Sequence, residues 1–242
     1  MTLANSERLR REERALTTHW PEIIPLDVGE FTFAADEEWA GELGVVVAYA
    51  IRRREGVLLF DTGFGFGSQE LEERYHQKAR WIEDVLGEAG IRRDEVDVVA
   101  NCHLHADHAG QNARMTGVPI FVQPAELEIA RAGDYTIDEW IDGPGVRYEA
   151  VEGDHELVPG IRILATPGHA PGHQSLVVDQ PGGPVLLSGQ AVYGLDEWLE
   201  QPGREGRSTA RNQPAYEVSL AKLRALEPTR VLFAHDRRPW SR

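Results

Sequence analysis

Three histidines and one aspartate lie within six residues, in the spacing His-x-His-x-Asp-His from residue 103 to residue 108. Side chains alternate along an extended segment, so His103 and His105 are predicted to point the same way and to bind one metal ion. A tight turn or helix start would present Asp107 and His108 to a second ion beside the first. Imidazoles and carboxylates suit zinc, iron, manganese and cobalt. A loop that is merely rich in histidine explains this spacing less well, because four such donors are costly to bury without partners.

Other potential ligands follow segments that are predicted to be strands. His169 and His173 occur in the run Thr-Pro-Gly-His-Ala-Pro-Gly-His, and His235 follows the apolar residues 231–233. Six of the nine histidines thus lie in such positions. Scattered surface histidines would not gather in this way, so we expect distant parts of the chain to meet in one metal centre.

Residues 101–110 resemble the signature of the metallo-β-lactamase superfamily of metal-dependent hydrolases. The resemblance implies an α/β fold, namely a four-layer αββα sandwich. Within the superfamily the chain is most similar to the N-acyl homoserine lactone hydrolases, or quorum-quenching lactonases, from about residue 24 onward. The specific parts are residues 103–110, 166–169 and 172–176, together with Tyr193.

The resemblance also implies two sets of metal ligands. One ion takes three imidazoles and keeps an open position, as expected of a catalytic zinc, and the other takes one carboxylate and two imidazoles. The first set is His103, His105 and His169, and the second is Asp107, His108 and His235. His173 lies outside both sets and is expected to pack or to orient a ligand. Asp61 is implied to orient an imidazole N–H, although a residue that ends a strand in a turn is an equally good interpretation.

One candidate ligand departs from the family pattern. Most two-metal members place an aspartate that bridges the ions where this chain has Gln190. An amide is neutral, one methylene longer and a weaker ligand, so a negative charge is missing between two dications. We expect the second ion to bind weakly, or the two ions to be bridged by hydroxide alone, or a single ion to bind at the three histidines.

The implied reaction is the opening of a lactone ring, as in N-acyl homoserine lactones, by attack of hydroxide bound to the metal. Asp107 would be both a ligand and a proton shuttle to the leaving oxygen. Tyr193 would stabilise the carbonyl oxygen or the leaving alkoxide, unless it is a core aromatic residue at a strand end. Four aromatic residues in predicted loops are candidates for an apolar wall around the acyl chain: Phe64, Phe66, Trp140 and Trp198.

Other functions remain open at this point, because fold alone does not fix function. A β-lactam hydrolase or a thioesterase would use the same metal-binding block, although the thioesterase is expected to have a long C-terminal helical domain. A non-catalytic binding protein that holds a metal is a third possibility, with Gln190 as the sign of lost catalysis.

Composition narrows the partners and the compartment. The chain has 242 residues, with 25 basic and 40 acidic side chains and a formal charge of −15, which opposes binding to nucleic acid and disfavours the superfamily's nucleases. No apolar run approaches the roughly 20 residues of a membrane span.

The lone cysteine, Cys102, excludes an internal disulfide and favours the cytoplasm. Alternation should turn Cys102 away from His103, so we interpret it as a buried apolar residue rather than a ligand. A homodimer is plausible from the relatives.

The elements that must position these residues alternate between strands and helices, which favours a single layered α/β domain over 1–242. A leader helix is expected over 6–16, and an irregular segment with scattered aromatic residues over 133–160. These residues, Tyr135, Trp140 and Tyr148, are expected to pin the segment to the body rather than to line a pocket. We predict strands near 24–33, 45–51, 57–60, 96–100, 119–122, 161–164, 174–178, 185–187 and 231–233, and helices over 68–89, 124–131 and 214–226. The candidates for the inward face of the last helix are Val218, Ala221, Leu223 and Leu226.

Overall fold

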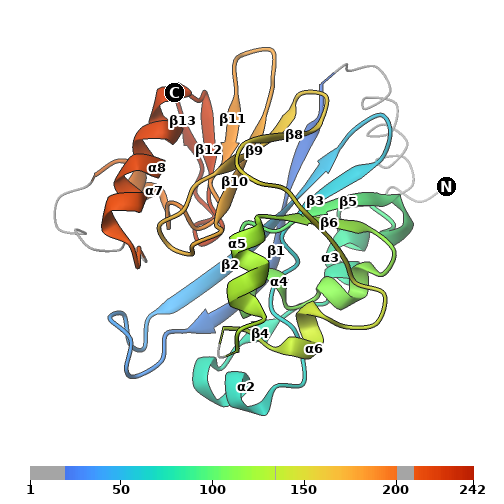
Figure 1. Cartoon of the computed structure of the whole chain (residues 1–242), viewed down its shortest axis with the longest axis vertical. Helices are drawn as coiled ribbons and strands as arrows, with labels where there is room; N and C mark the ends of the chain where they lie inside the picture. Colours follow the sequence, from blue (N-terminus) through green and yellow to red (C-terminus); the bar gives the residue numbers. More distant parts are fainter. Residues whose placement is uncertain (1–19, 134, 201–209) are drawn as a thin grey trace.

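The computed structural model describes residues 20–133, 135–200 and 210–242, and these form two β-sheets between helices (Figure 1). The leader helix predicted over 6–16 lies outside the described residues. The first sheet has the order β4 (Lys78–Ala79), β1 (Glu22–Thr32), β2 (Leu43–Arg52), β3 (Val57–Phe60), β5 (Val96–Ala100), β6 (Pro119–Val122) and β7 (Arg147–Ala150). The second has the order β13 (Trp240–Ser241), β12 (Arg230–Leu232), β11 (Val185–Leu187), β10 (Gln174–Val178), β9 (Ile161–Ala165) and β8 (His155–Val158).

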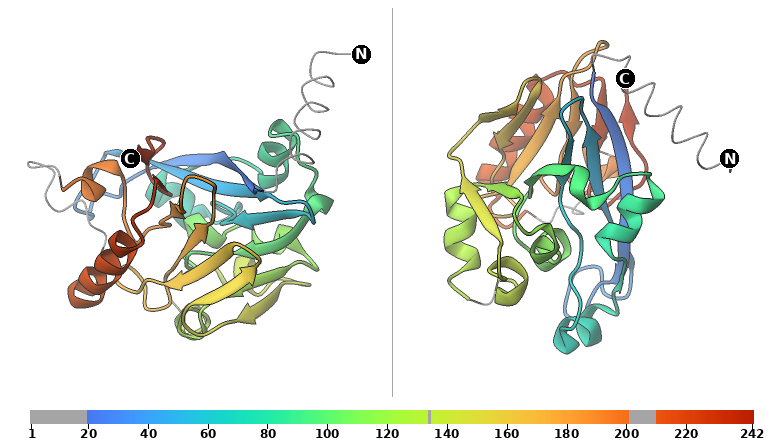
Figure 2. Two further views of the ribbon diagram at one scale, coloured as in Figure 1. Left: turned by 90° about the horizontal axis from the view of Figure 1, so that it is seen from above. Right: turned by 90° about the vertical axis from the view of Figure 1, so that its right-hand side faces the viewer.

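The helices lie outside this pair of sheets (Figures 1 and 2). They are α2 (Gln69–Tyr75), α3 (Ile82–Glu88), α4 (Ala106–Ala109), α5 (Pro124–Ala130), α6 (Asp138–Ile141), α7 (Leu195–Trp198) and α8 (Gln213–Ala225), with short 3₁₀ turns at Arg93–Glu95 and Asn112–Met115. Figure 1 shows α8 on the outer side of the second sheet and α3 on the outer side of the first.

Successive side chains of each central strand point to opposite faces of its sheet, so each strand contributes to the core on both faces. Val46, Ala48 and Ala50 of β2 pack in the core beneath α3, with Ile82 and Leu86 of that helix. The alternate residues Val47, Tyr49 and Ile51 pack against Ile163, Leu176 and Leu187 of the second sheet. A third core, with Leu186 and Leu223, lies between the second sheet and α8. The four-layer αββα sandwich expected from the resemblance is therefore confirmed.

Most predicted strands and helices are found, but the single helix over 68–89 is wrong. Ser68 caps α2, because its hydroxyl accepts from the backbone N–H of Leu71. The helix then ends at His76, whose φ is +44°. Lys78 and Ala79 form β4, which pairs with the edge of β1, and α3 begins only at Ile82. Pairing with a sheet edge outweighs helical periodicity at this point.

Two further expectations need correction. The segment 133–160 is not wholly irregular, because it contains α6, β7 and β8. The inward face of α8 is formed by Tyr216, Ser219 and Leu223, whereas Val218, predicted to face inward, is 70% exposed. Among the described residues, no helix is both long and apolar enough to cross a lipid bilayer.

Candidate metal centre

The ligands predicted from the sequence come from the carboxyl ends of strands in both sheets. His103 and His105 follow β5, and Asp107 and His108 lie in α4 immediately beyond. His169 follows β9, Gln190 follows β11 and His235 follows β12. Strands β9, β11 and β12 run in one direction, because β10 is antiparallel to both β9 and β11, and β11 is parallel to β12. The strand ends therefore open at one edge of the sandwich.

Three imidazoles converge on one point. Nε2 of His103 lies 2.8 Å from Nδ1 of His105, and Nε2 of His169 lies 3.0 Å from the same atom. A ring nitrogen carries either one hydrogen or one lone pair, so Nδ1 of His105 cannot satisfy both neighbours. Three lone pairs around one cation would satisfy all three, and a tetrahedral zinc–nitrogen site would separate them by about 3.3 Å. This donor set fits a divalent metal ion.

A second group of donors lies beside the first. Nε2 of His108 is 3.2 Å from Nε2 of His235 and 3.2 Å from Oε1 of Gln190. Oδ2 of Asp107 is 3.3 Å from the same atom of His108 and 3.6 Å from Nε2 of His235. The Gln190 side chain thus reaches the centre, in agreement with the position assigned to it from the sequence. All seven predicted side chains come together at one site.

Burial keeps most of these imidazoles neutral. It lowers the pKa of His103 and of His105 well below the ordinary value, and neighbouring imidazoles lower both further. It also lowers the pKa of His235 to about 4. Burial acts in the same way on His108, but the negative charges of Asp107 and Asp61 outweigh it and raise that pKa. Neutral imidazoles have the free lone pairs that metal binding requires.

Backbone and carboxylate groups fix the orientation of the rings. Oδ2 of Asp61 lies 3.0 Å from Nδ1 of His108, and Oδ1 accepts the backbone N–H of Cys102 at 2.7 Å. Nδ1 of His235 lies 2.8 Å from the carbonyl oxygen of Val45. In both rings Nδ1 is engaged and Nε2 faces the centre. Asp61 therefore contacts an imidazole as the resemblance implies, and its role in orienting a metal ligand stays a prediction.

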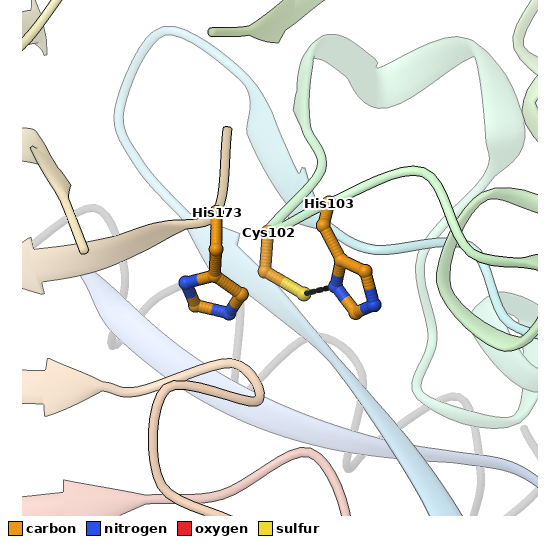
Figure 3. Close-up of side chains that lie close together, drawn as sticks. All are labelled: Cys102, His103 and His173. Atoms are coloured by element: carbon orange, nitrogen blue, oxygen red, sulfur yellow. Dashed lines mark hydrogen bonds between the residues drawn. The ribbon is translucent and has the colours of Figure 1, made fainter. Parts of the chain in front are cut away.

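Cys102 is buried as predicted, but its orientation differs from the prediction. Its Sγ lies 3.1 Å from Nδ1 of His103 (Figure 3). The same atom lies 3.2 Å from Nδ1 of His108. The argument from strand alternation fails because β5 ends at Ala100. Burial raises the pKa of the Cys102 thiol, so it stays protonated. The Cys102 thiol thus contacts the Nδ1 side of two predicted ligands, His103 and His108.

His173, drawn in Figure 3 with Cys102 and His103, has no nitrogen left for a metal. Its Nε2 accepts the backbone N–H of Gln190 at 3.0 Å, so the neutral ring carries its hydrogen on Nδ1. That nitrogen lies 2.9 Å from Oγ1 of Thr166 and donates to it. His173 therefore orients the backbone at position 190, in agreement with its expected place outside the ligand sets.

Tyr193 lies beside the centre. Its ring stacks on the ring of His235, with 4.8 Å between centroids and an angle of 17° between planes. Its backbone N–H donates to Glu197, whose other carboxylate oxygen accepts the Tyr216 hydroxyl. Tyr193 lines a cavity of about 250 Å³. Phe33 lines both this cavity and the larger one that opens onto the predicted ligands. Tyr193 thus contacts a predicted ligand through its ring, and its catalytic role stays a prediction.

The main cavity, of about 650 Å³, opens onto the predicted ligands. His105, Asp107, His169 and Gln190 line it, and aromatic rings form its walls: Phe31, Phe33, Trp39, Phe64, Tyr75 and Tyr135. Of the four wall residues proposed from the sequence, Phe64 is correct. The other three pack elsewhere: Phe66 stacks on Trp81, Trp140 lies against Gly65 and Trp198 lies in the core beneath α8.

Residues 41–235 match the family model of the metallo-beta-lactamase superfamily. The chain belongs to this superfamily. A Bacillus N-acyl homoserine lactonase is 32% identical over 211 residues, which cover 79% of this chain and 81% of the relative. The lactonase AttM of Azorhizobium caulinodans is 35% identical over 168 residues, 62% of either protein.

Solved structures of lactone hydrolases have a similar overall fold. A mutant of AiiA from B. thuringiensis, with N-decanoyl-L-homoserine bound at its active site, has a TM-score of 0.76 and 27% identity, over 91% of this chain and 95% of that chain. An N-acyl homoserine lactone hydrolase with the product N-hexanoyl-L-homoserine at its catalytic metal centre has a TM-score of 0.75 and 29% identity, over 91% and 94%. The family expected from the sequence is confirmed.

Sequence reasoning missed Glu126 near the site, and it was wrong to expect Tyr135 to pin the loop rather than to line a pocket. Tyr135 lines the cavity, and its ring lies 4.4 Å from the ring of His105. Glu126 is fully buried and accepts three hydrogen bonds. A signal for Glu126 was present, because the helical period places it on the same face of α5 as the buried Ala130. An acidic residue on a buried face needs partners, and this indicates a specific role.

Proposed function

We propose that this protein hydrolyses the lactone ring of N-acyl homoserine lactones or similar lactones, with divalent metal ions held by the clustered histidines. The observation that carries the proposal is the three-imidazole cluster of His103, His105 and His169, two members of which open into a cavity with aromatic walls. The similarity to N-acyl homoserine lactonases over about four-fifths of the chain supports the substrate class.

The residues divide the work by position. A divalent ion at these side chains would act as a Lewis acid and would lower the pKa of bound water to near neutral pH. The aromatic walls would bind an acyl chain and exclude water from the ester. Asp107 lines the cavity, and its pKa is low because contact with His108 outweighs the effect of burial, so it is an ionised carboxylate at neutral pH. We assign to this carboxylate the transfer of a proton to the leaving oxygen. Tyr193 would hydrogen-bond the carbonyl oxygen or the leaving alkoxide.

We further propose zinc as the metal, with unequal affinities at the two sites. The three-histidine site offers neutral imidazoles, whereas the second has one carboxylate, two imidazoles and the neutral amide of Gln190. Without a bridging negative charge, repulsion between two dications is less compensated. Dialysis of zinc-loaded protein against graded chelator should leave one equivalent per chain before the other is lost. Two equivalents that are lost together with matched affinity would contradict this proposal.

Assays with matched variants test the proposed function. Zinc-loaded protein should open N-acyl homoserine lactones, and His105→Ala and Asp107→Ala should reduce kcat/KM by at least about 100-fold. His155→Ala serves as a control, because His155 is an exposed residue of β8. Parallel assays with thioesters and β-lactams decide between this activity and the other hydrolases of the fold.

A second candidate function is that of a non-catalytic protein that holds a metal and binds a ligand. The neutral amide of Gln190 among the second group of donors favours it. Metal-loaded protein that binds lactones but opens neither lactones nor aryl esters would decide for this candidate. We also propose a cytoplasmic location and a homodimer; size-exclusion chromatography with light scattering tests the oligomeric state.

A further inference from the structure

A carboxylate outside the ligand sets connects the two halves of the three-histidine cluster. Glu126, in α5, is 0% exposed and receives three hydrogen bonds. Oε1 accepts the backbone N–H of Leu104 at 2.8 Å and the hydroxyl of Tyr135 at 2.5 Å. Oε2 accepts the backbone N–H of Gly172 at 3.1 Å. Both oxygens are used, and each faces a different part of the centre.

The two backbone donors belong to the loops that carry the ligands. Leu104 stands between His103 and His105, in the loop that follows β5 of the first sheet. Gly172 stands three residues after His169, in the loop that joins β9 and β10 of the second sheet. A single carboxylate therefore spans the loops from the two sheets, and the three imidazoles meet only when these loops keep their separation.

The contact between Glu126 and the second loop is close. A Cβ atom built on Gly172 would lie 2.4 Å from the backbone nitrogen of Glu126 and 2.5 Å from its Cβ. Any side chain at position 172 would therefore push the His169 loop away from α5. Glycine at this position allows the carboxylate to reach both loops.

The third donor extends this connection to the cavity. The hydroxyl of Tyr135 is held by Glu126, and the Tyr135 ring lies 4.4 Å from the ring of His105. Tyr135 also forms part of the cavity wall. The same carboxylate thus fixes the distance between the two ligand loops and the aromatic ring beside one ligand.

We propose that Glu126 is a positioning residue that sets the geometry of the three-histidine site and holds Tyr135 against it. Loss of one acceptor would leave a buried backbone N–H unpaired and let the two loops move apart. Groups that orient metal ligands from outside the coordination sphere typically change metal affinity 10–100-fold when they are replaced. The inference rests on the proposed metal site and not on the lactone substrate.

The test compares Glu126→Gln with Glu128→Gln, its matched control on the exposed side of the same helix. Metal-free protein is titrated with Co²⁺ against a chromophoric chelator, and the visible spectrum of the one-equivalent complex is recorded. Glu126→Gln should weaken the first equivalent about 10–100-fold and change the cobalt spectrum. Glu128→Gln should stay within about twofold of the parent protein. An unchanged affinity and spectrum in Glu126→Gln would overturn the proposal.

Two further variants keep the test decisive. Tyr135→Phe removes one hydroxyl and keeps both backbone contacts, so it should leave cobalt affinity within about threefold and raise KM several-fold, with kcat nearly unchanged, for any substrate that the parent protein turns over. An unchanged KM would refute the role assigned to Tyr135. If Glu126→Gln does not fold, Glu126→Asp replaces it, since a side chain one methylene shorter cannot reach both loops and should weaken cobalt similarly. Full cobalt affinity in Glu126→Asp would refute the proposal. A parent protein that binds cobalt but hydrolyses nothing would contradict only the lactonase function.

Discussion

The imidazole of His108 and the carboxylate of Asp61 form a buried pair, with Nδ1 and Oδ2 3.0 Å apart. Asp61 ends its strand with φ at +67°, a conformation that few residues other than glycine, asparagine and aspartate adopt readily. This backbone geometry turns the carboxylate toward Cys102 and His108. One residue therefore meets the needs of a strand-ending turn and of an imidazole partner, so the two interpretations of Asp61 describe the same feature.

Asp61→Asn should retain the fold and weaken the second metal site. Asparagine tolerates the positive φ, and its carbonyl oxygen can still accept from Cys102. Its amide would donate toward Nδ1 of His108, which moves the ring hydrogen to Nε2 and blocks the metal-facing lone pair. We expect the affinity of the second zinc equivalent to fall about 10–100-fold, measured by isothermal titration. The exposed Asp94→Asn is the control, and equal affinities in both variants would contradict the proposed role of Asp61.

Gln190→Glu should strengthen the second site. The substitution changes the side-chain length very little and places a negative charge beside His108, where Oε1 of Gln190 already lies 3.2 Å from Nε2. Attraction to a dication in a buried site should increase the affinity of the second equivalent at least about tenfold. Zinc content after dialysis against a fixed chelator concentration measures the change. No gain in the second equivalent would show that the amide does not limit binding.

Short motifs fix local geometry, so the sequence could place several predicted ligands beside one another, and that these residues bind metal stays a prediction. The alternation argument placed His103 and His105 on the same side correctly, and their ring nitrogens meet at 2.8 Å. It failed for Cys102, because β5 ends at Ala100 and the Cys102 sulfur lies against the ring of His103. Position in a loop also does not determine where a side chain points. Phe66, expected in the acyl wall, stacks instead on Trp81.

Long-range contacts were the part that sequence patterns could not supply. The expected helix over 68–89 is interrupted because Lys78 and Ala79 pair with β1, a partner about fifty residues away along the chain. The reach of Glu126 to Leu104 and Gly172 depends on how the two sheets pack. That the whole chain forms a single domain stays a prediction.

Tyr193→Phe should separate catalysis from metal binding. The ring stacks on His235 and would keep that contact without the hydroxyl. If the hydroxyl stabilises the developing charge on the substrate oxygen, kcat should fall about 10–100-fold while zinc content stays the same. The measurement is steady-state hydrolysis of an N-acyl homoserine lactone by zinc-loaded protein. Unchanged kcat would assign Tyr193 a packing role beside His235.

The metal-free protein should lose stability as the pH falls below about 6.5. Burial lowers the pKa values of His103, His105, His173 and His235, so the unfolded chain binds more protons than the folded protein between these values and the ordinary one near 6.5. For His235, whose pKa is about 4, the loss by pH 4 is roughly 3 kcal/mol.

Two groups oppose this trend. The pKa of His108 is raised, so its contribution to stability is present at low pH and is lost as the pH rises through the raised value. Burial raises the pKa of Glu126, which acts in the same direction. Four lowered imidazoles outnumber these two groups, so the free energy of unfolding, measured in urea between pH 7.5 and 4.5, should decrease toward acid. His235→Gln should make the dependence shallower, because it removes one group that takes up a proton on unfolding, and a slope of opposite sign would contradict the neutral-imidazole description of the centre.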